Sequence, residues 1–202
     1  MDKGVATRQR IIETAASLMN RRGWLSTPVS DVLTATELRK GGLYHHFDGI
    51  DSVARHAFQF AADKLVARVV ARLGDEGSAQ LRLMALLDAF DFSGQRQPPF
   101  TFGCPLLNAA TEVDDQSEVF RRLVLAAFNR LIDAIEAVIA GGVRSRELRS
   151  DIAPRRAARF LLATFEGGVM LSGVARDPSW FSDLRDDLRD VIQSWSAPGV
   201  AA

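Results

Sequence analysis

The side chains best suited to bind another molecule lie close together in one short stretch of the sequence. Tyr44, His45 and His46 follow one another directly, and all three carry hydrogen-bond donors. Such groups suit phosphate oxygens and base edges, so the chemistry they offer is the binding of a nucleic acid. Gly41 and Gly42 stand just before them. Because glycine is a poor helix former, this pair indicates a surface whose backbone approaches DNA closely.

Metal binding and covalent catalysis are both disfavoured for the same residues. His45 and His46 would point about 100° apart on a helix, and no cysteine stands near them to complete a metal site. Cys104 is the single cysteine, and a nucleophilic thiol needs a base within reach. The remaining histidine, His56, also lies in the N-terminal third of the sequence, far from Cys104. The sequence therefore predicts no metal, no cofactor and no enzyme.

The composition is that of a soluble globular protein rather than of a strongly basic one. Apolar residues make up 47% of the 202 residues, and the formal net charge is zero. Residues 1–55 hold eight Lys/Arg against six Asp/Glu, a net of +2, which permits a DNA-binding head without demonstrating one. A lone cysteine, no apolar run of about 18 residues and no apolar segment behind the N-terminal charges together predict a cytoplasmic protein.

Apolar residues recur at three- and four-residue steps throughout, which predicts an all-α protein of about nine helices. The expected helices cover residues 6–22, 28–35, 39–46, 51–73, 79–93, 102–113, 117–141, 154–176 and 179–195. Thr27 and Ser117 are expected to cap helix starts, Pro154 and Pro178 to begin helices, and residues 93–101 to form a loop. Short helices followed by longer ones predict two domains, a helix-turn-helix head at 1–50 and a larger helical body at 51–202.

An ordered set of motifs resembles the DNA-binding head of the TetR family of transcriptional regulators. The chain reads GW at 23–24, TPVSDVL at 27–33 and KGGLYHHF at 40–47. The resemblance implies a homodimer that binds a palindromic double-stranded operator through the second short helix of each head. It also implies a C-terminal domain that takes up a small molecule of unknown identity and releases the DNA. A repressor is the more common case by analogy.

The resemblance implies DNA contacts from the recognition helix and its surroundings, with Trp24, Leu43 and Phe47 in the core. The implied contact residues are Thr27, Ser30, Arg39, Lys40, Gly41, Gly42, Tyr44, His45 and His46.

The head departs from the family pattern at two positions. Members usually have glycine in the turn before the recognition helix, where this chain has Glu37. A side chain at positive φ costs about 1 kcal/mol, so we expect a strained or reshaped turn. Ile50 replaces a lysine that binds phosphate in most members, and Arg39 is a candidate to compensate. These departures motivate one alternative, a helical small-molecule-binding protein that has lost operator recognition.

The expected ligand domain offers apolar and aromatic side chains, together with two polar ones a helical turn apart. The ligand candidates are Phe58, Phe90, Phe102, Cys104, Asn108, Glu112, Phe128, Phe165 and Met170. Asn108 and Glu112 suit a ligand and a buried interhelical bond equally well. Cys104 stands at a helix start, where a thiolate is favoured, so a thiol-based redox or electrophile sensor is a further alternative to a small buried apolar residue.

The last two helices are expected to pair with a second copy of the chain in a four-helix interface, as the resemblance implies. The dimer candidates are Phe160, Gly167, Leu171, Phe181, Leu184, Leu188, Ile192 and Trp195. The alternative is that this apolar stripe packs only within its own chain, and the sequence does not separate the two.

Overall fold

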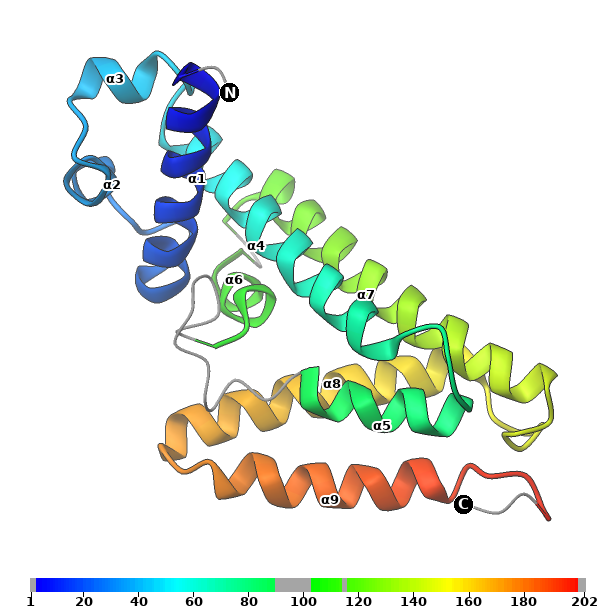
Figure 1. Ribbon diagram of the computed structural model, residues 1–202. Coiled ribbons are helices and arrows are strands. Elements are labelled where there is room, and N and C mark those ends of the chain that lie inside the picture. Colours follow the sequence, from blue (N-terminus) through cyan, green and yellow to red (C-terminus); the bar gives the residue numbers. More distant parts are fainter. Residues whose placement is uncertain (1–2, 90–102, 114–115, 200–202) are drawn as a thin grey trace. The chain divides into compact units, whose positions relative to one another are not determined.

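A computed structural model describes residues 3–89, 103–113 and 116–199 (Figure 1). This part of the chain contains nine α-helices and one isolated β-bridge, which confirms the predicted all-helical fold. The helices are α1 (Lys3–Arg22), α2 (Val29–Thr36), α3 (Lys40–Tyr44), α4 (Ile50–Leu73), α5 (Ala79–Ala89), α6 (Pro105–Val113), α7 (Glu118–Arg144), α8 (Pro154–Ala175) and α9 (Ser179–Gln193). The loop predicted at 93–101 lies outside the described residues.

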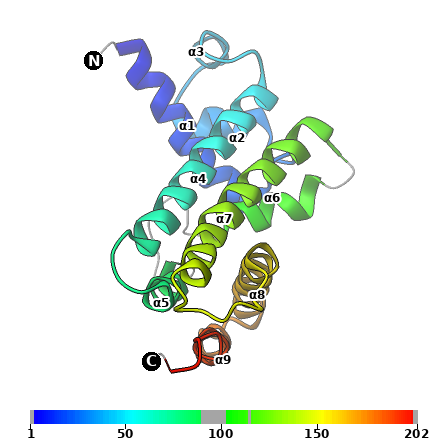
Figure 2. The same ribbon diagram turned by 90° about the vertical axis from the view of Figure 1, so that its right-hand side faces the viewer.

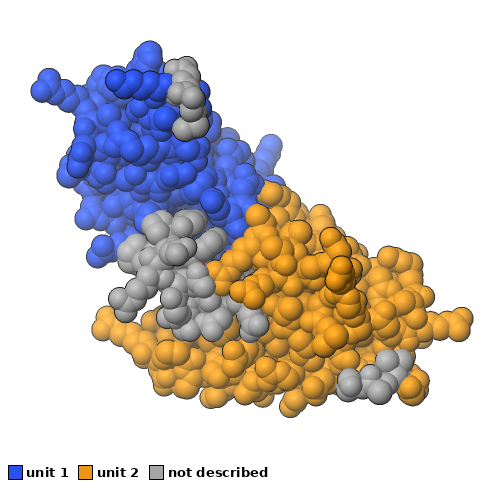
Figure 3. Space-filling model, in the orientation of Figure 1, with its two compact units in different colours: residues 1–65, 95–127 blue, residues 66–94, 128–202 orange. Residues whose placement is uncertain are grey.

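The chain divides into two compact units, coloured separately in Figure 3. Unit 1 comprises residues 1–65 and 95–127, and unit 2 comprises residues 66–94 and 128–202. Unit 1 thus contains the predicted head together with α6 and the first part of α7, which belong to the predicted C-terminal body. Helices α4 and α7 each contribute to both units.

An aromatic cluster forms the centre of unit 1. Trp24, in the turn after α1, is 1% exposed and meets the ring of Phe58 edge to face, with ring centroids 5.4 Å apart. Phe120 lies 5.2 Å from Phe58 and 6.4 Å from Trp24. The buried face of α1 carries Ile11 and Met19, both fully enclosed. Aromatic pairs of this geometry add about 0.5–1.5 kcal/mol each to the area they bury, so the turn after α1 is firmly anchored.

Local signals explain where α7 and α8 begin. The hydroxyl of Ser117 accepts the backbone N–H of Phe120, as expected of an N-cap. Glu118 in the first turn of α7 accepts hydrogen bonds from Arg121 and from Arg122, and these bonds lower the pKa of Glu118 to about 2. Pro154 opens α8, where the absent N–H has no cost.

Unit 2 is built around the antiparallel pair of α8 and α9, which lie side by side in both views (Figures 1 and 2). Gly168 makes the pairing close, since a Cβ there would stand 2.2 Å from a methyl carbon of Leu184. Phe181, Leu188 and Ile192 are 5% exposed or less. The apolar stripe of α9 therefore packs mainly within its own chain, against α8 and α5.

Of the residues predicted to form the dimer interface, Phe181, Leu188 and Ile192 are buried within their own chain and Leu184 is half-buried there, while their contact with a second copy stays a prediction. The sequence showed the apolar stripe of α9 but not what it packs against, and in the structure it packs against α8 of the same chain. The outer face of α8 is an apolar surface left open in the described part of unit 2. Phe160 and Leu171 are about half exposed. A Cβ on Gly167 would meet nothing within 4 Å.

Candidate nucleic-acid interface

Helices α2 and α3 form the predicted helix-turn-helix in unit 1. Arg10 of α1 donates to the carbonyl oxygen of Thr36 at 2.9 Å and so holds the end of α2. Arg22 pairs with Asp31 on α2. Together with the buried side chain of Val32, these contacts fix α2 against α1, so α3 extends from a firmly held helix.

The turn between α2 and α3 keeps a left-handed residue at Glu37, with φ 56° and ψ 33°. Its backbone N–H bonds to the carbonyl oxygens of Leu33 and Thr34, which closes the end of α2. The turn is therefore strained rather than reshaped, because a side chain occupies a conformation that favours glycine.

Two buried side chains anchor the short helix α3. Leu43 is completely buried and Phe47 is 3% exposed. The ring of Phe47 contacts the ring of His56 on α4, with centroids 5.5 Å apart, and the guanidinium of Arg8 lies 4.9 Å above it. These contacts turn one side of α3 into the core, so the opposite side faces outward.

The outward side carries most of the predicted DNA contacts. Tyr44 is 47% exposed, so its ring is not part of the core and its hydroxyl is open to a partner outside the fold. Ser30, Arg39, Lys40 and His45 are also exposed, and His46 is half-buried beside His45. Two cations, a phenol and imidazole groups therefore lie within one short, mostly exposed segment, which we call the α3 tip and define as Arg39, Lys40, Gly41, Tyr44, His45 and His46.

The two glycines of α3 differ in their surroundings. A Cβ on Gly41 would meet nothing within 4 Å. A Cβ on Gly42 would stand 3.5 Å from the side chain of Leu38, in ordinary contact. Neither glycine has a positive φ. Nothing within the fold therefore requires glycine at Gly41, and an external molecule that approaches the backbone is the simplest reason for it.

Thr27 does not join this surface. It is 4% exposed, and its hydroxyl donates to the carbonyl oxygen of Gly23 at 2.6 Å. Pro28 occupies the N-cap position of α2, and no side chain caps that helix. The predicted helix cap at Thr27 is thus wrong, because its hydroxyl bonds to the turn after α1, while its contact with the DNA backbone stays a prediction.

Asn108 and Glu112, predicted as ligand contacts or interhelical bonds, make interhelical bonds. The carboxylate of Glu112 accepts the backbone N–H groups of Trp24 and Leu25 at 2.9 and 3.1 Å. One turn earlier, the amide of Asn108 donates to the backbone and side-chain oxygens of Asn20 at 3.1 and 3.0 Å. We call these bonds the α6 clasp. It ties α6 to the end of α1, where the chain enters the helix-turn-helix.

The other described ligand candidates belong to both units. Phe58 belongs to the aromatic cluster of unit 1, whereas Phe165 is fully buried in unit 2 and Phe128 is half-buried there. Met170 is 47% exposed on α8, and its place in a ligand wall stays a prediction. Phe90 and Phe102 lie outside the described residues.

Cys104 is completely buried at the start of α6. That burial fits the small apolar role better than a reactive thiol, which needs access to its oxidant. Within the described ranges, no three His, Cys, Asp or Glu side chains come together as metal ligands would.

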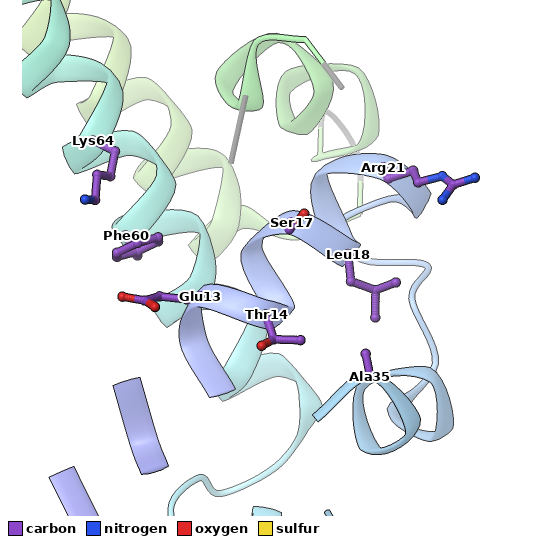
Figure 4. Close-up of a pocket in the computed structure, with 8 residues that line it drawn as sticks. All are labelled: Glu13, Thr14, Ser17, Leu18, Arg21, Ala35, Phe60 and Lys64. Atoms are coloured by element: carbon purple, nitrogen blue, oxygen red, sulfur yellow. The ribbon is translucent and has the colours of Figure 1, made fainter. Parts of the chain in front are cut away.

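Unit 1 also contains an open groove of about 630 Å³ between α1, α2 and α4 (Figure 4). Leu18 of α1 and Ala35 of α2 point toward one another at one end of it. At the other end, the ammonium of Lys64 lies 5.5 Å from the ring of Phe60. Sequence reasoning missed this groove because its residues come from three separate segments.

Two family models match the chain. Residues 11–57 match the model described as bacterial regulatory proteins of the tetR family. Residues 79–188 match a tetracyclin repressor-like C-terminal domain, and this segment covers more than half of the chain.

Individual relatives agree with the family models. A TetR transcriptional regulator from Chloroflexus aurantiacus J-10-FL is 33% identical, covers 98% of this chain and 99% of its own, and superimposes with a TM-score of 0.90. The transcriptional repressor DhaR of Mycobacterium sp. (strain GP1) is 25% identical over 84% of each chain. The reduced form of E. coli NemR, at 20% identity over 96% of this chain and 100% of its own, shares the fold with a TM-score of 0.82.

Proposed function

We propose that this chain, which belongs to the TetR family of bacterial transcriptional regulators, is a cytoplasmic repressor that binds a palindromic operator as a homodimer and leaves it when a small molecule binds. The family consists of regulators rather than enzymes. One observation carries the proposal: the α3 tip is exposed and rich in hydrogen-bond donors, while Leu43 and Phe47 of the same segment are buried.

The α3 tip offers the two kinds of contact that operator recognition needs. Arg39 and Lys40 supply positive charge to phosphate oxygens, which gives affinity and its dependence on salt. Tyr44 and His45 supply donors for phosphate or base edges in the major groove. Gly41 lets the helix backbone come close to the DNA, since no side chain stands between them.

The outer face of α8 supports the homodimer. Phe160, Leu171 and Val174 recur at helical spacing and are 48%, 47% and 80% exposed. Gly167 between them permits a close approach of a second helix. Within the described residues, α8 alone has the length and apolar composition that crossing a membrane would need. A partner helix accounts for the apolar composition of α8. One side of α8 is buried within the chain, and the exposed side would be covered by the partner.

The α6 clasp supports a route from the ligand domain to the head. Helix α6 lies within the segment that matches the C-terminal family model, yet Glu112 holds two backbone N–H groups of the turn after α1. A ligand that moves α6 would therefore move the helix-turn-helix with it. By linkage, operator DNA would weaken the binding of that ligand by the same factor.

Binding to the promoter region beside its own gene tests the proposal. We expect a gel shift that a non-specific competitor does not abolish, and that weakens steeply as salt is raised. Replacing Tyr44 and His45 together by alanine should remove the sequence-selective shift while leaving the thermal unfolding midpoint unchanged, since both side chains are exposed. The absence of any selective shift at low salt would favour the alternative of a binding protein that has lost operator recognition.

A further inference from the structure

We infer that the exposed indole of Trp180 docks into an open groove at the opposite end of the α8–α9 pair of a second copy of this chain. The inference rests on the homodimer of the proposed function and adds its register. Two copies would meet with their α8 helices running in opposite directions, and each would place one indole in the groove of the other.

The groove lies where the start of α8 meets the end of α9, and its volume is about 400 Å³. Its floor and walls mix apolar side chains with arginines. The lining residues are Arg149, Asp151, Ile152, Ala153, Arg156, Ala157, Phe160, Val191 and Trp195. Arg149 pairs with Asp151 at 3.0 Å, whereas Arg156 is exposed and forms no salt bridge within the described residues. An aromatic ring beside a guanidinium fits such a groove by shape and by cation–π attraction.

The side chain that matches this groove is Trp180, at the other end of the helix pair. Its ring is 52% exposed in the first turn of α9, although its neighbour Phe181 is 5% exposed. Exposed tryptophan is costly to leave in water and is enriched at the centres of interfaces. Val191, which lines the groove, is eleven residues further along α9, so the two side chains point within about 20° of each other.

The surface between the indole and the groove allows two helices to meet. The Gly168–Leu184 contact fixes the register of α8 against α9 and sets Trp180 beside the end of α8 that carries Leu171. From the groove residue Ala157 to Leu171 the helix rises about 21 Å. Halfway along, Ala163 is exposed and Gly167 has no side chain. Small residues in the middle of α8, with larger ones toward both ends, allow the α8 helices of two copies to cross closely near Ala163 and Gly167.

Charge selects the pairing of opposite ends over the pairing of like ends. Arg156 and Arg159 are exposed near the groove, whereas Asp183 and Asp187 are exposed on the part of α9 that follows Trp180. With a two-fold axis parallel to the helices, like ends of the two copies would meet, so arginines would face arginines and aspartates would face aspartates. An axis across them brings the arginines of one copy to the aspartates of the other, and the indole to the groove.

Cysteine crosslinking tests this register without removing the indole. Cys104, which is buried, is replaced by alanine, and Ser179→Cys is combined with Ala153→Cys. Ser179 neighbours the indole, Ala153 lines the groove, and both are exposed. With a short bismaleimide, we expect a covalent dimer from the double variant and none from either single variant, because like positions lie far apart in this register.

A second variant measures the contribution of the indole itself. We expect Trp180→Ala to weaken dimerisation at least tenfold in sedimentation equilibrium, with unchanged helical circular dichroism. Leu81→Ala is the matched control, since Leu81 is 66% exposed on α5. It should leave the dimer constant unchanged.

Each other result has a definite meaning. A covalent dimer from Ser179→Cys alone would overturn the register and show that like ends meet, as would a dimer that none of the variants crosslinks. Equal effects of Trp180→Ala and Leu81→Ala would overturn the docking of the indole. A parent chain that stays monomeric at tens of micromolar would overturn the inference and also the homodimer of the proposed function. The first three results leave that homodimer standing.

Discussion

At the scale of single residues, Gly41 and Gly42 separate a role in folding from a role in binding. Both stand in α3, and neither adopts a conformation that only glycine tolerates. The fold leaves open space around Gly41, whereas Gly42 faces Leu38. Alanine at either position should therefore help the helix, but only alanine at Gly41 should stand between the helix backbone and DNA.

We predict that Gly41→Ala raises the free energy of unfolding by up to about 1 kcal/mol, since alanine is the better helix former. The same change should weaken operator binding about tenfold, or about 1.4 kcal/mol. Denaturant unfolding and fluorescence anisotropy with labelled operator measure the two effects. Gly42→Ala is the control and should stabilise the fold with little change in affinity. Unchanged DNA binding in Gly41→Ala would show that no DNA approaches this face of α3.

Glu37 offers a second test, because its strain lies in the backbone and its charge lies in the side chain. Glu37→Gly should raise the free energy of unfolding by up to about 1 kcal/mol, since it relieves the positive φ at the end of α2. Glu37→Ala keeps that strain and should not stabilise. Both variants remove a carboxylate near the α3 tip, so both should bind DNA more tightly at low salt. Equal stabilisation by glycine and alanine would contradict the strain.

At the scale of elements, the α6 clasp is the feature on which signal transfer depends. The Glu112 carboxylate accepts two N–H groups at once, and a hydrogen bond to a charged group contributes about 1.5–3 kcal/mol. The bond is local to unit 1, so its loss should act first on the turn between α1 and α2.

We predict that Glu112→Gln lowers the free energy of unfolding by about 1–2 kcal/mol, because the amide retains one acceptor and loses the charge. Amide hydrogen exchange at Trp24 and Leu25 should quicken more than exchange elsewhere in unit 1, and operator affinity should fall. Thr111→Ala is the control, since that side chain is exposed on the same helix. A uniform change in exchange across the unit would argue against a specific hold on the turn.

Sequence patterns predicted the elements well and their partners poorly. Apolar spacing located all nine helices of the described residues, and Ser117 and Pro154 marked two starts through chemistry that is local to the chain. The stripe of α9 was visible, but periodicity does not state what covers a stripe, so its burial against α8 was missed. Asn108 and Glu112 each bond to a residue 88 positions earlier in the chain. Rules that use only neighbouring residues cannot predict such a contact.

The candidate site divides in the same way. The α3 tip was predictable because its donors are adjacent in sequence and the buried residues between them fix the outward side. Thr27 was misassigned because a hydroxyl before a proline suits a helix cap, whereas its bond to Gly23 depends on the shape of the turn after α1. The groove at the end of α8 and the exposure of Trp180 depend on packing that only the folded chain shows.

At the scale of the whole molecule, DNA binding has to come from the arrangement of charge rather than from its sum. The net charge of the chain is zero, so a general attraction to phosphate is weak. Affinity then depends on the few cations of the α3 tip and on the second head of a dimer. A dimer that places two tips one helical turn apart binds a palindrome, whereas a single tip has too few contacts for selective binding.

Protection of guanine N7 from dimethyl sulfate, on operator DNA bound by the intact protein, tests this claim most directly. That atom lies in the major groove, where α3 should sit. We predict two protected clusters on one face of the duplex, with centres about 10 base pairs or a multiple of that apart. They should disappear together when Tyr44 and His45 are replaced by alanine. Bound DNA whose major-groove guanines remain fully reactive, or a single cluster without a symmetric mate, would contradict a dimer that reads DNA through α3.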